Sequence, residues 1–111
     1  MAKYSDNEKS AIVSLLIEMI NVDNVISLKE MDEINVINRD LNITEEVFLL
    51  GKALDFNYSV ELVKHMSDEK KLEVAKYITR IIDADGVVKD VEIQLLNDIC
   101  HRTGLDIILS D

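Results

Sequence analysis

Residues 78–105 read ITRIIDADGVVKDVEIQLLNDICHRTGL, and this stretch decides the fold. Apolar residues recur at helical spacing on both sides of an acidic turn at residues 83–86, which predicts a helix, a tight turn and a second helix. The same plan stands 62 positions earlier, in residues 16–43, which read LIEMINVDNVISLKEMDEINVINRDLNI. The chain therefore contains two copies of one helix–turn–helix unit.

The two copies agree at the positions that form the turn and open the following helix. Each has one turn aspartate, Asp23 or Asp85, and one glutamate seven residues later, Glu30 or Glu92. The residue after each aspartate is asparagine or glycine, two types that tolerate a positive φ angle. We therefore expect the same chain reversal in both copies.

Length and composition favour one all-helical domain. A chain of 111 residues is a single domain by its size, and we place it at 1–111 with repeat halves at about 5–55 and 67–111. Proline is absent and there are three glycines, too few for an all-β protein with many tight turns. We expect an all-α fold: a compact bundle of about six to seven helices with an internal pseudo-two-fold duplication.

The predicted helices begin at recognisable N-cap residues. Ser5 and Ser27 are each followed three positions later by glutamate, which is the capping-box pattern. Thr44 and Ser67 are N-cap candidates for two further helices. A sixth helix is expected to begin near Asp90 or Val91.

Two segments are expected to depart from long helices. The stretch at residues 55–58 breaks the apolar periodicity, so only a short helix is predicted through residues 60–63. Gly104 is a good left-handed terminator for the sixth helix. Residues 105–110 then have the length for one or two turns of a seventh helix.

Periodicity also predicts which apolar side chains lie inside. The helical stripes place Met31 and Leu50 in the core. Val87 and Val88 are expected to anchor the second turn to that core. With two Phe, three Tyr and no Trp in the chain, the core must be mainly aliphatic.

The net charge of −10 restricts the classes of partner. An acidic surface repels phosphate backbones, which disfavours nucleic-acid binding and simple docking to anionic lipid. Cations or basic protein surfaces are favoured instead, with the alternative that the acids only keep the protein in solution. One basic cluster is either a solvated face or a contact for an acidic partner; it comprises Lys64, His65, Lys70 and Lys71, with Lys76 or Arg80.

Nothing in the sequence predicts export or membrane insertion. No N-terminal stretch has a signal-peptide layout, and no apolar run reaches the roughly 20 residues of a membrane span. The single Cys100 cannot form an internal disulfide and is expected to be a buried, inert thiol. We therefore expect a cytoplasmic protein.

The pattern ADGVVxxxE at residues 84–92, followed by an apolar helix and repeated in part at residues 22–30, resembles the TerB-like family of tellurite-resistance proteins. In that family each half places an aspartate in an interhelical turn and a glutamate at the start of the next helix. The resemblance implies a pseudo-symmetric all-helical fold and a bacterial or phage stress-response setting, with cation binding and peripheral, membrane-associated assemblies. The first copy departs from the pattern, with Val-Asp-Asn in place of Ala-Asp-Gly, and the last helix is short.

The acidic turns admit three interpretations. Residues 81–92 have the length of an EF-hand calcium loop, but Ile81 stands where the first oxygen ligand is needed and Lys89 adds a positive charge. Alternatively, the aspartates accept backbone hydrogen bonds and the glutamates close capping boxes, with no ligand. Finally, the carboxylates of both copies could converge on one divalent cation, calcium, magnesium or manganese. The metal ligands predicted by this last interpretation are Asp23, Glu30, Asp85 and Glu92.

No residue set predicts catalysis. His65 and His101 are separated by several elements and lack a matching nucleophile or base. We expect a non-enzymatic binding or scaffold module, linked by its resemblance to tellurite resistance or stress response. It would recognise protein partners or divalent cations through the acidic turns, with no other cofactor. The alternatives are a metal-dependent hydrolase with clustered carboxylates and a purely structural domain whose acids are caps alone.

Overall fold

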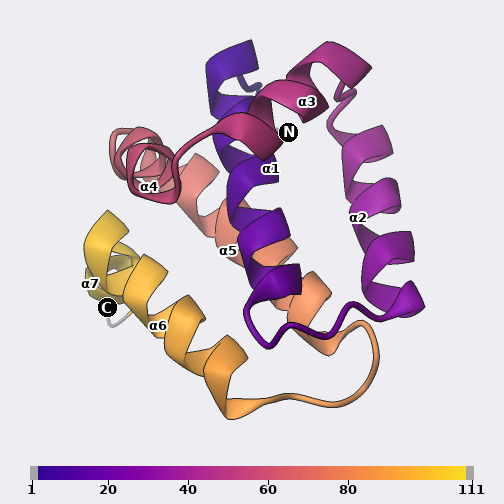
Figure 1. The fold of residues 1–111 in the computed structure, drawn as a ribbon. Helices are drawn as coiled ribbons and strands as arrows, with labels where there is room; N and C mark the ends of the chain where they lie inside the picture. Colours follow the sequence, from indigo (N-terminus) through magenta and orange to yellow (C-terminus); the bar gives the residue numbers. More distant parts are fainter. Residues whose placement is uncertain (1–2, 110–111) are drawn as a thin grey trace.

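The computed structural model describes residues 3–109, and these residues form seven α-helices and no strand, so the predicted all-α fold is confirmed (Figure 1). The helices pack around a shared hydrophobic core. None of them, within this described range, is both long and apolar enough to cross a bilayer. They are α1 (Asp6–Asn21), α2 (Leu28–Asp40), α3 (Glu45–Ala53), α4 (Phe56–Lys64), α5 (Asp68–Asp83), α6 (Asp90–Thr103) and α7 (Leu105–Leu109).

The predicted N-caps set where the helices begin. The hydroxyl oxygen of Ser5 accepts from the Glu8 N–H at 3.1 Å, and the Glu8 carboxylate accepts from the Ser5 N–H at 2.8 Å. Thr44 and Ser67 cap α3 and α5, each accepting from the N–H three residues on, at 3.2 and 3.3 Å. These bonds satisfy backbone donors that have no partner within the helix.

The prediction for α4 was wrong at its start. Residues 55–58 do not interrupt the helix, because Asp55 is its N-cap and accepts from the Tyr58 N–H at 3.1 Å. The helix therefore begins at Phe56 rather than near residue 60. Two aromatic residues in the first turn disturbed the apolar stripe and concealed an ordinary aspartate cap.

The long helix α1 lies between the other helices, which explains its apolar sequence. It packs against α3, α4 and α5 (Figure 1). Ser10 is buried within it, and its hydroxyl donates to the carbonyl of Asp6 at 2.9 Å, which satisfies the polar group. The buried apolar residues of α1 are Ala11, Ile12, Val13, Leu15, Leu16, Met19 and Ile20.

A glycine allows α3 to cross closely over α1. A Cβ atom at Gly51 would lie 2.6 Å from the Cβ of Val13 and 2.8 Å from the carbonyl oxygen of Ser10. Contacts this short require a shift of one helix, so the crossing depends on the missing side chain. This crossing positions the residues of α3 that face the first turn.

The second half follows the first in the order and length of its long helices, because α5 and α6 have 16 and 14 residues where α1 and α2 have 16 and 13. Gly104 ends α6 with a φ of 82°, as predicted. The seventh helix also forms, over residues 105–109; Ser110, the last residue predicted for it, lies outside the described residues. The buried residues of α5 are Val74, Tyr77, Ile78, Ile81 and Ile82.

Four apolar residues predicted to lie inside are at the surface instead. Val87 and Val88 do not anchor the second turn, because their side chains are 57% and 52% exposed. The turn runs outward from the bundle end, beyond the reach of the core. Leu50 and Met31 are also exposed, since the buried faces of α3 and α2 are narrower than their apolar stripes.

Candidate functional site

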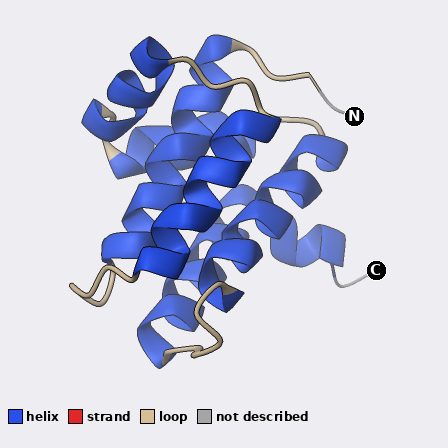
Figure 2. Cartoon of the chain, turned by 90° about the vertical axis from the view of Figure 1, so that its right-hand side faces the viewer, coloured by secondary structure: helices blue, strands red, loops and turns tan. Residues whose placement is uncertain are grey.

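The two acidic turns lie at the same end of the bundle (Figures 1 and 2). The first joins α1 to α2 through residues 22–27, and the second joins α5 to α6 through residues 84–89. An ion pair between Asp23 of the first turn and Lys89 of the second links them. The duplication in the sequence therefore produces two adjoining turns.

Each turn is closed by the same hydrogen bond. Oδ1 of Asp23 accepts from the Val25 N–H, and Oδ1 of Asp85 accepts from the Val87 N–H, both at 3.0 Å. The asparagine or glycine after each aspartate adopts a left-handed conformation, with φ angles of 62° and 76°. An aspartate that accepts from the N–H two residues on forms an Asx turn. The aspartates are therefore part of the turns they were predicted to shape.

Glu30 and Glu92 are buried, each with only 3% of its surface exposed. The Glu30 carboxylate accepts from the Ser27 N–H at 3.2 Å, and the Glu92 carboxylate accepts from the Lys89 N–H at 3.0 Å. Ser27 completes its capping box by accepting from the Glu30 N–H at 3.0 Å. Lys89 cannot do the same, because an ammonium group has no lone pair. Both glutamates thus cap the helices they begin.

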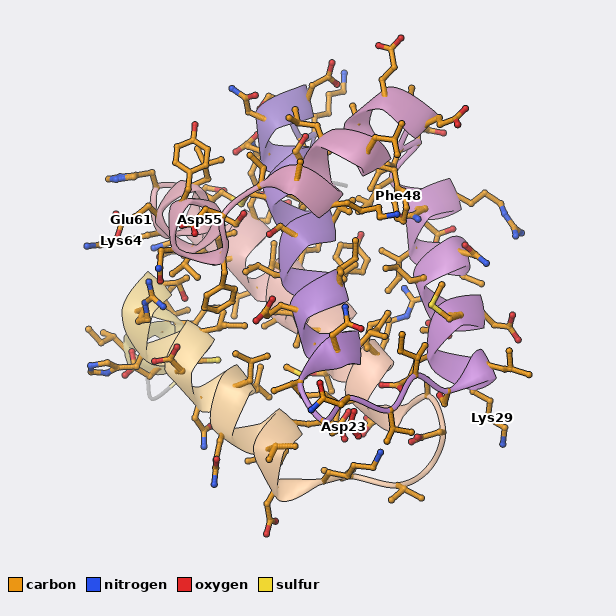
Figure 3. All side chains as sticks on the ribbon, viewed as in Figure 1. Asp23, Lys29, Phe48, Asp55, Glu61 and Lys64 are labelled. Atoms are coloured by element: carbon orange, nitrogen blue, oxygen red, sulfur yellow. The ribbon has the colours of Figure 1, made fainter. Side chains whose placement is uncertain are left out.

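The ion pair between the turns changes the acidity of both of its members. The Lys89 ammonium and the Val25 N–H hold the pKa of Asp23 below its usual value. Asp23 in turn raises the pKa of Lys89, and the charges of Glu92 and Asp85 raise it further. Lys89 is therefore a cation within electrostatic reach of carboxylates from both copies. It pairs with Asp23, which is labelled in Figure 3.

The pKa of Glu92 is affected by charges from both copies. Burial raises the pKa of Glu92; the Lys89 N–H lowers it, and the charges of Glu30 and Asp23 raise it again. Glu92 of the second copy is thus within electrostatic reach of Glu30 and Asp23 of the first. The charge of Asp85 acts on Lys89.

The predicted metal ligands are all engaged in other interactions. Across residues 3–109, no set of three or more His, Cys, Asp and Glu side chains is arranged to hold a metal ion. Binding of calcium, magnesium or manganese at these carboxylates stays a prediction. Such an ion would have to displace the ammonium of Lys89 from Asp23.

Each turn exposes a pair of branched apolar side chains at matching positions. Val25 and Ile26 in the first turn, and Val87 and Val88 in the second, are between 52% and 58% exposed. The sequence held a signal for them, because both copies place apolar residues in a turn, outside any helical stripe. Further exposed apolar residues at the starts of α2 and α6 are Leu28, Met31, Val91 and Ile93.

We name the surface of residues 22–32 and 83–93 the turn face. These segments contain seven acidic and two basic residues, which is half of the net charge of −10. Besides the buried caps Glu30 and Glu92, four of the acids form no ion pair with any residue in the described part of the chain. These are Asp32, Asp83 and Asp90, which are exposed, and Asp85, which is half-buried.

The basic cluster is partly neutralised by ion pairs. Lys70 pairs with Glu8 at 3.0 Å, and Arg80 pairs with Glu33 at 2.7 Å. His65 is exposed and lies 3.9 Å from the carboxylate of Glu61 on the same helix. This cluster is therefore a weaker candidate for partner binding than the turn face.

Cys100 and His101 do not form a nucleophile–base pair. The Nδ1 atom of His101 lies 3.1 Å from the carboxylate of Asp106. Cys100 is half-buried rather than buried, and burial together with the charge of Asp106 raises its pKa. A thiol with a raised pKa is a poor nucleophile at neutral pH.

Comparisons with known proteins support the fold. No family model and no curated protein matches the chain. Among solved structures, the chain is similar to a protein of unknown function, PG1108, from Porphyromonas gingivalis W83, with a TM-score of 0.78 and 26% sequence identity. The match covers 94% of this chain and 82% of that one. Nearly the whole helical arrangement is therefore shared with a protein whose role is unknown.

Proposed function

We propose that this protein is a non-enzymatic, TerB-like binding module that recognises a protein partner through its turn face. The observation that carries the proposal is the exposure of matching apolar pairs, Val25–Ile26 and Val87–Val88, in both copies. A single exposed apolar residue needs no explanation, but a cluster of them at one end of a molecule is typical of an interaction surface.

Interactions within the chain hold the two turns of the turn face before any partner binds. The Asx hydrogen bonds, the buried glutamate caps and the Asp23–Lys89 ion pair hold both turns. A preorganised surface loses little conformational entropy on binding. Full burial of a Val or Ile side chain contributes about 1.5–3 kcal/mol, so the four exposed side chains offer a substantial gross driving force.

Charge favours a basic partner. The unpaired acids of the turn face would attract lysine and arginine side chains, and this attraction speeds association and discriminates against acidic partners. Two copies of this chain meeting through their turn faces would instead bring like charges together. Self-association through this surface is therefore disfavoured.

A binding experiment with a synthetic probe tests the proposal. The probe is an amphipathic helical peptide with leucines on one face and lysines on the other, which we name the Lys-rich peptide. A control peptide of the same design carries glutamates in place of the lysines. We expect the chain to bind the Lys-rich peptide and not the control peptide with glutamates. The affinity for the Lys-rich peptide should fall as the salt concentration rises. Replacing all four valine and isoleucine residues of the two pairs by serine should weaken binding at least tenfold, by isothermal titration.

Leu49→Ser is the matched control, because Leu49 is equally exposed but lies on α3, outside the turn face. It should bind as the wild type does. Equal affinity of the four-fold serine variant and the wild type would contradict the proposal, as would no binding of the Lys-rich peptide at all.

Divalent-cation binding is the second candidate, favoured by the electrostatic reach of Asp23 and Glu30 to Glu92. Thermal melts with a chelator, and then with millimolar calcium, magnesium or manganese, distinguish it from protein recognition. A ligand that binds only the folded state raises the melting temperature. A rise that the wild type shows and Glu30→Gln/Glu92→Gln lacks would establish a cation site; the proposal expects no rise.

The resemblance to the TerB-like family suggests a stress-response setting, tellurite resistance included. Deleting the gene and measuring growth on tellurite tests that setting. Complementation with the wild type and with the four-fold serine variant would then show whether the turn face is needed for it.

A further inference from the structure

We propose that an apolar socket between α1, α2 and α3 receives one large apolar side chain of the basic partner. This inference rests on the proposed function and names the feature of the partner that the turn face selects. The socket has a volume of about 220 Å³. Its apolar lining consists of Ile17, Ile20, Ile26, Met31, Ile34 and Phe48.

The size of the socket decides what fits. Sites for drug-sized molecules and cofactors measure about 300–1,000 Å³, so this socket is small for them. An apolar cavity of about 150 Å³ accepts benzene. A socket of about 220 Å³ therefore matches one phenylalanine, leucine or methionine side chain.

The socket is continuous with the turn face. Ile26 belongs to the first turn and Met31 to the start of α2, and both are exposed while also lining the socket. Deeper in, Ile20 and Ile34 are buried. A partner helix lying on the first turn would therefore pass the mouth of the socket and could insert a side chain there, as helices do when they dock into apolar grooves.

The polar residues at the socket constrain the sequence around the inserted side chain. Asn21 and Lys52 complete the lining. The ammonium of Lys52 lies 5.9 Å from the ring centre of Phe48, a cation–π contact. The unpaired acids lie on the turn face instead, at Asp32 and, in or next to the second turn, at Asp83, Asp85 and Asp90. We infer that the partner's basic residues lie on the turn side of its anchor, and that a neutral or acidic residue lies towards α3.

Charge complementarity also selects among occupants of the socket. A second copy of this chain would bring its own acidic surface against this one. A free apolar small molecule would make no electrostatic interaction with the acids of the turn face. A basic helix can do both: one apolar side chain fills the socket, and its basic residues interact with the acids of the turn face.

Two Lys-rich peptides that differ only at one central position, phenylalanine or alanine, test the inference. We expect the alanine peptide to bind the wild type about tenfold more weakly, as for the loss of a buried anchor. Met31→Trp should fill the mouth of the socket and reduce the affinity for the phenylalanine peptide to that for the alanine peptide. Ile26→Trp is a second variant of the same design, and a thermal melt checks that each variant is folded.

Methyl NMR gives a readout that does not depend on affinity. With ¹³C-labelled methionine methyl groups, the phenylalanine peptide should shift the signal of Met31 at the socket mouth. The signal of Met66, which is buried, should not move. Toluene at millimolar concentration should shift Met31 without any peptide, because the socket accepts a benzene ring.

The outcomes separate the socket from the proposed function. Equal affinity of the wild type for the two peptides would contradict the inference about the socket. The proposed binding at the turn face would still stand. An unmoved Met31 signal with toluene would also overturn it. Failure of both peptides to bind would overturn the proposed function and the socket together.

Discussion

At the scale of residues, the four predicted site acids fall into two kinds. Asp23 and Asp85 shape the turns with bonds to the N–H two residues on. Glu30 and Glu92 are buried caps, and the pKa of Glu92 is raised by burial and by neighbouring carboxylates. An acid with a raised pKa binds its proton more tightly in the folded state than in the unfolded chain, so its ionised form opposes folding.

Glu92→Gln should therefore raise the melting temperature at pH 7. Its amide oxygen can still accept from the Lys89 N–H, while the buried charge is removed. The penalty of the wild type is complete above the folded-state pKa of Glu92. It is lost as the pH falls through that value towards the ordinary 4.5, so the advantage of glutamine should shrink between pH 7 and pH 4.

The matched control is Glu92→Ala, which loses the charge and the acceptor together. It should melt below the wild type, because a lost cap costs about 1 kcal/mol. A glutamine variant that melts below the wild type at pH 7 would show that the carboxylate charge supports the fold there.

Asp85→Ala should lower stability by about 1 kcal/mol, as for a lost cap. The substitution removes the acceptor for the Val87 N–H, which is bonded at 3.0 Å. Asp85→Asn keeps an oxygen in that place and should melt close to the wild type. Chemical denaturation of both variants checks this; equal losses for alanine and asparagine would mean that the charge of Asp85, not its hydrogen bond, stabilises the turn.

At the scale of elements, the close crossing of α3 over α1 at Gly51 positions one wall of the socket. Gly51→Ala would place a Cβ atom 2.6 Å from Val13, so one helix must shift. Overpacking of this kind costs about 1–3 kcal/mol. We expect a lower melting temperature and, because α3 carries Phe48, a weaker preference for the phenylalanine peptide over the alanine peptide.

Gly86→Asn is the matched control for this substitution. A Cβ atom there meets nothing within 4 Å, and its φ of 76° is one that asparagine tolerates. Asn24 already adopts a φ of 62° at the matching position. The asparagine variant should therefore be nearly as stable as the wild type. A loss of stability as large as that of Gly51→Ala would show that the close helix crossing does not explain the effect of Gly51→Ala.

At the scale of the whole molecule, the features set by neighbouring residues were predictable. The caps at Ser5, Ser27, Thr44 and Ser67 depend on residues three positions apart, and the left-handed Gly104 depends on its missing side chain. The duplication also indicated which turns would match. These local signals were sufficient to predict an all-helical fold.

The features set by distant residues were not predictable from the chain alone. Val87 and Val88 are as apolar as core residues, and only the outward path of the turn shows that they are exposed. The Asp23–Lys89 ion pair joins residues 66 positions apart. The socket needs residues from three helices, and the role of Gly51 depends on how α3 crosses α1.

The distribution of charge and apolar surface over the molecule supports binding at one end. Half of the net negative charge and both exposed apolar pairs lie on the turn face. In the basic cluster, by contrast, Lys70 and Arg80 form ion pairs with Glu8 and Glu33. We therefore propose the turn face as the surface that binds a basic protein partner.

The most direct test of that claim is a titration of the ¹⁵N-labelled chain with the Lys-rich peptide, followed by amide NMR. We predict that the largest shifts fall in residues 22–32 and 83–93, with smaller ones at the socket in α3. The four-fold serine variant should show them only at much higher peptide concentration. Shifts concentrated on the outer side of α5 or around α4, or shifts that the serine variant retains unchanged, would contradict the account.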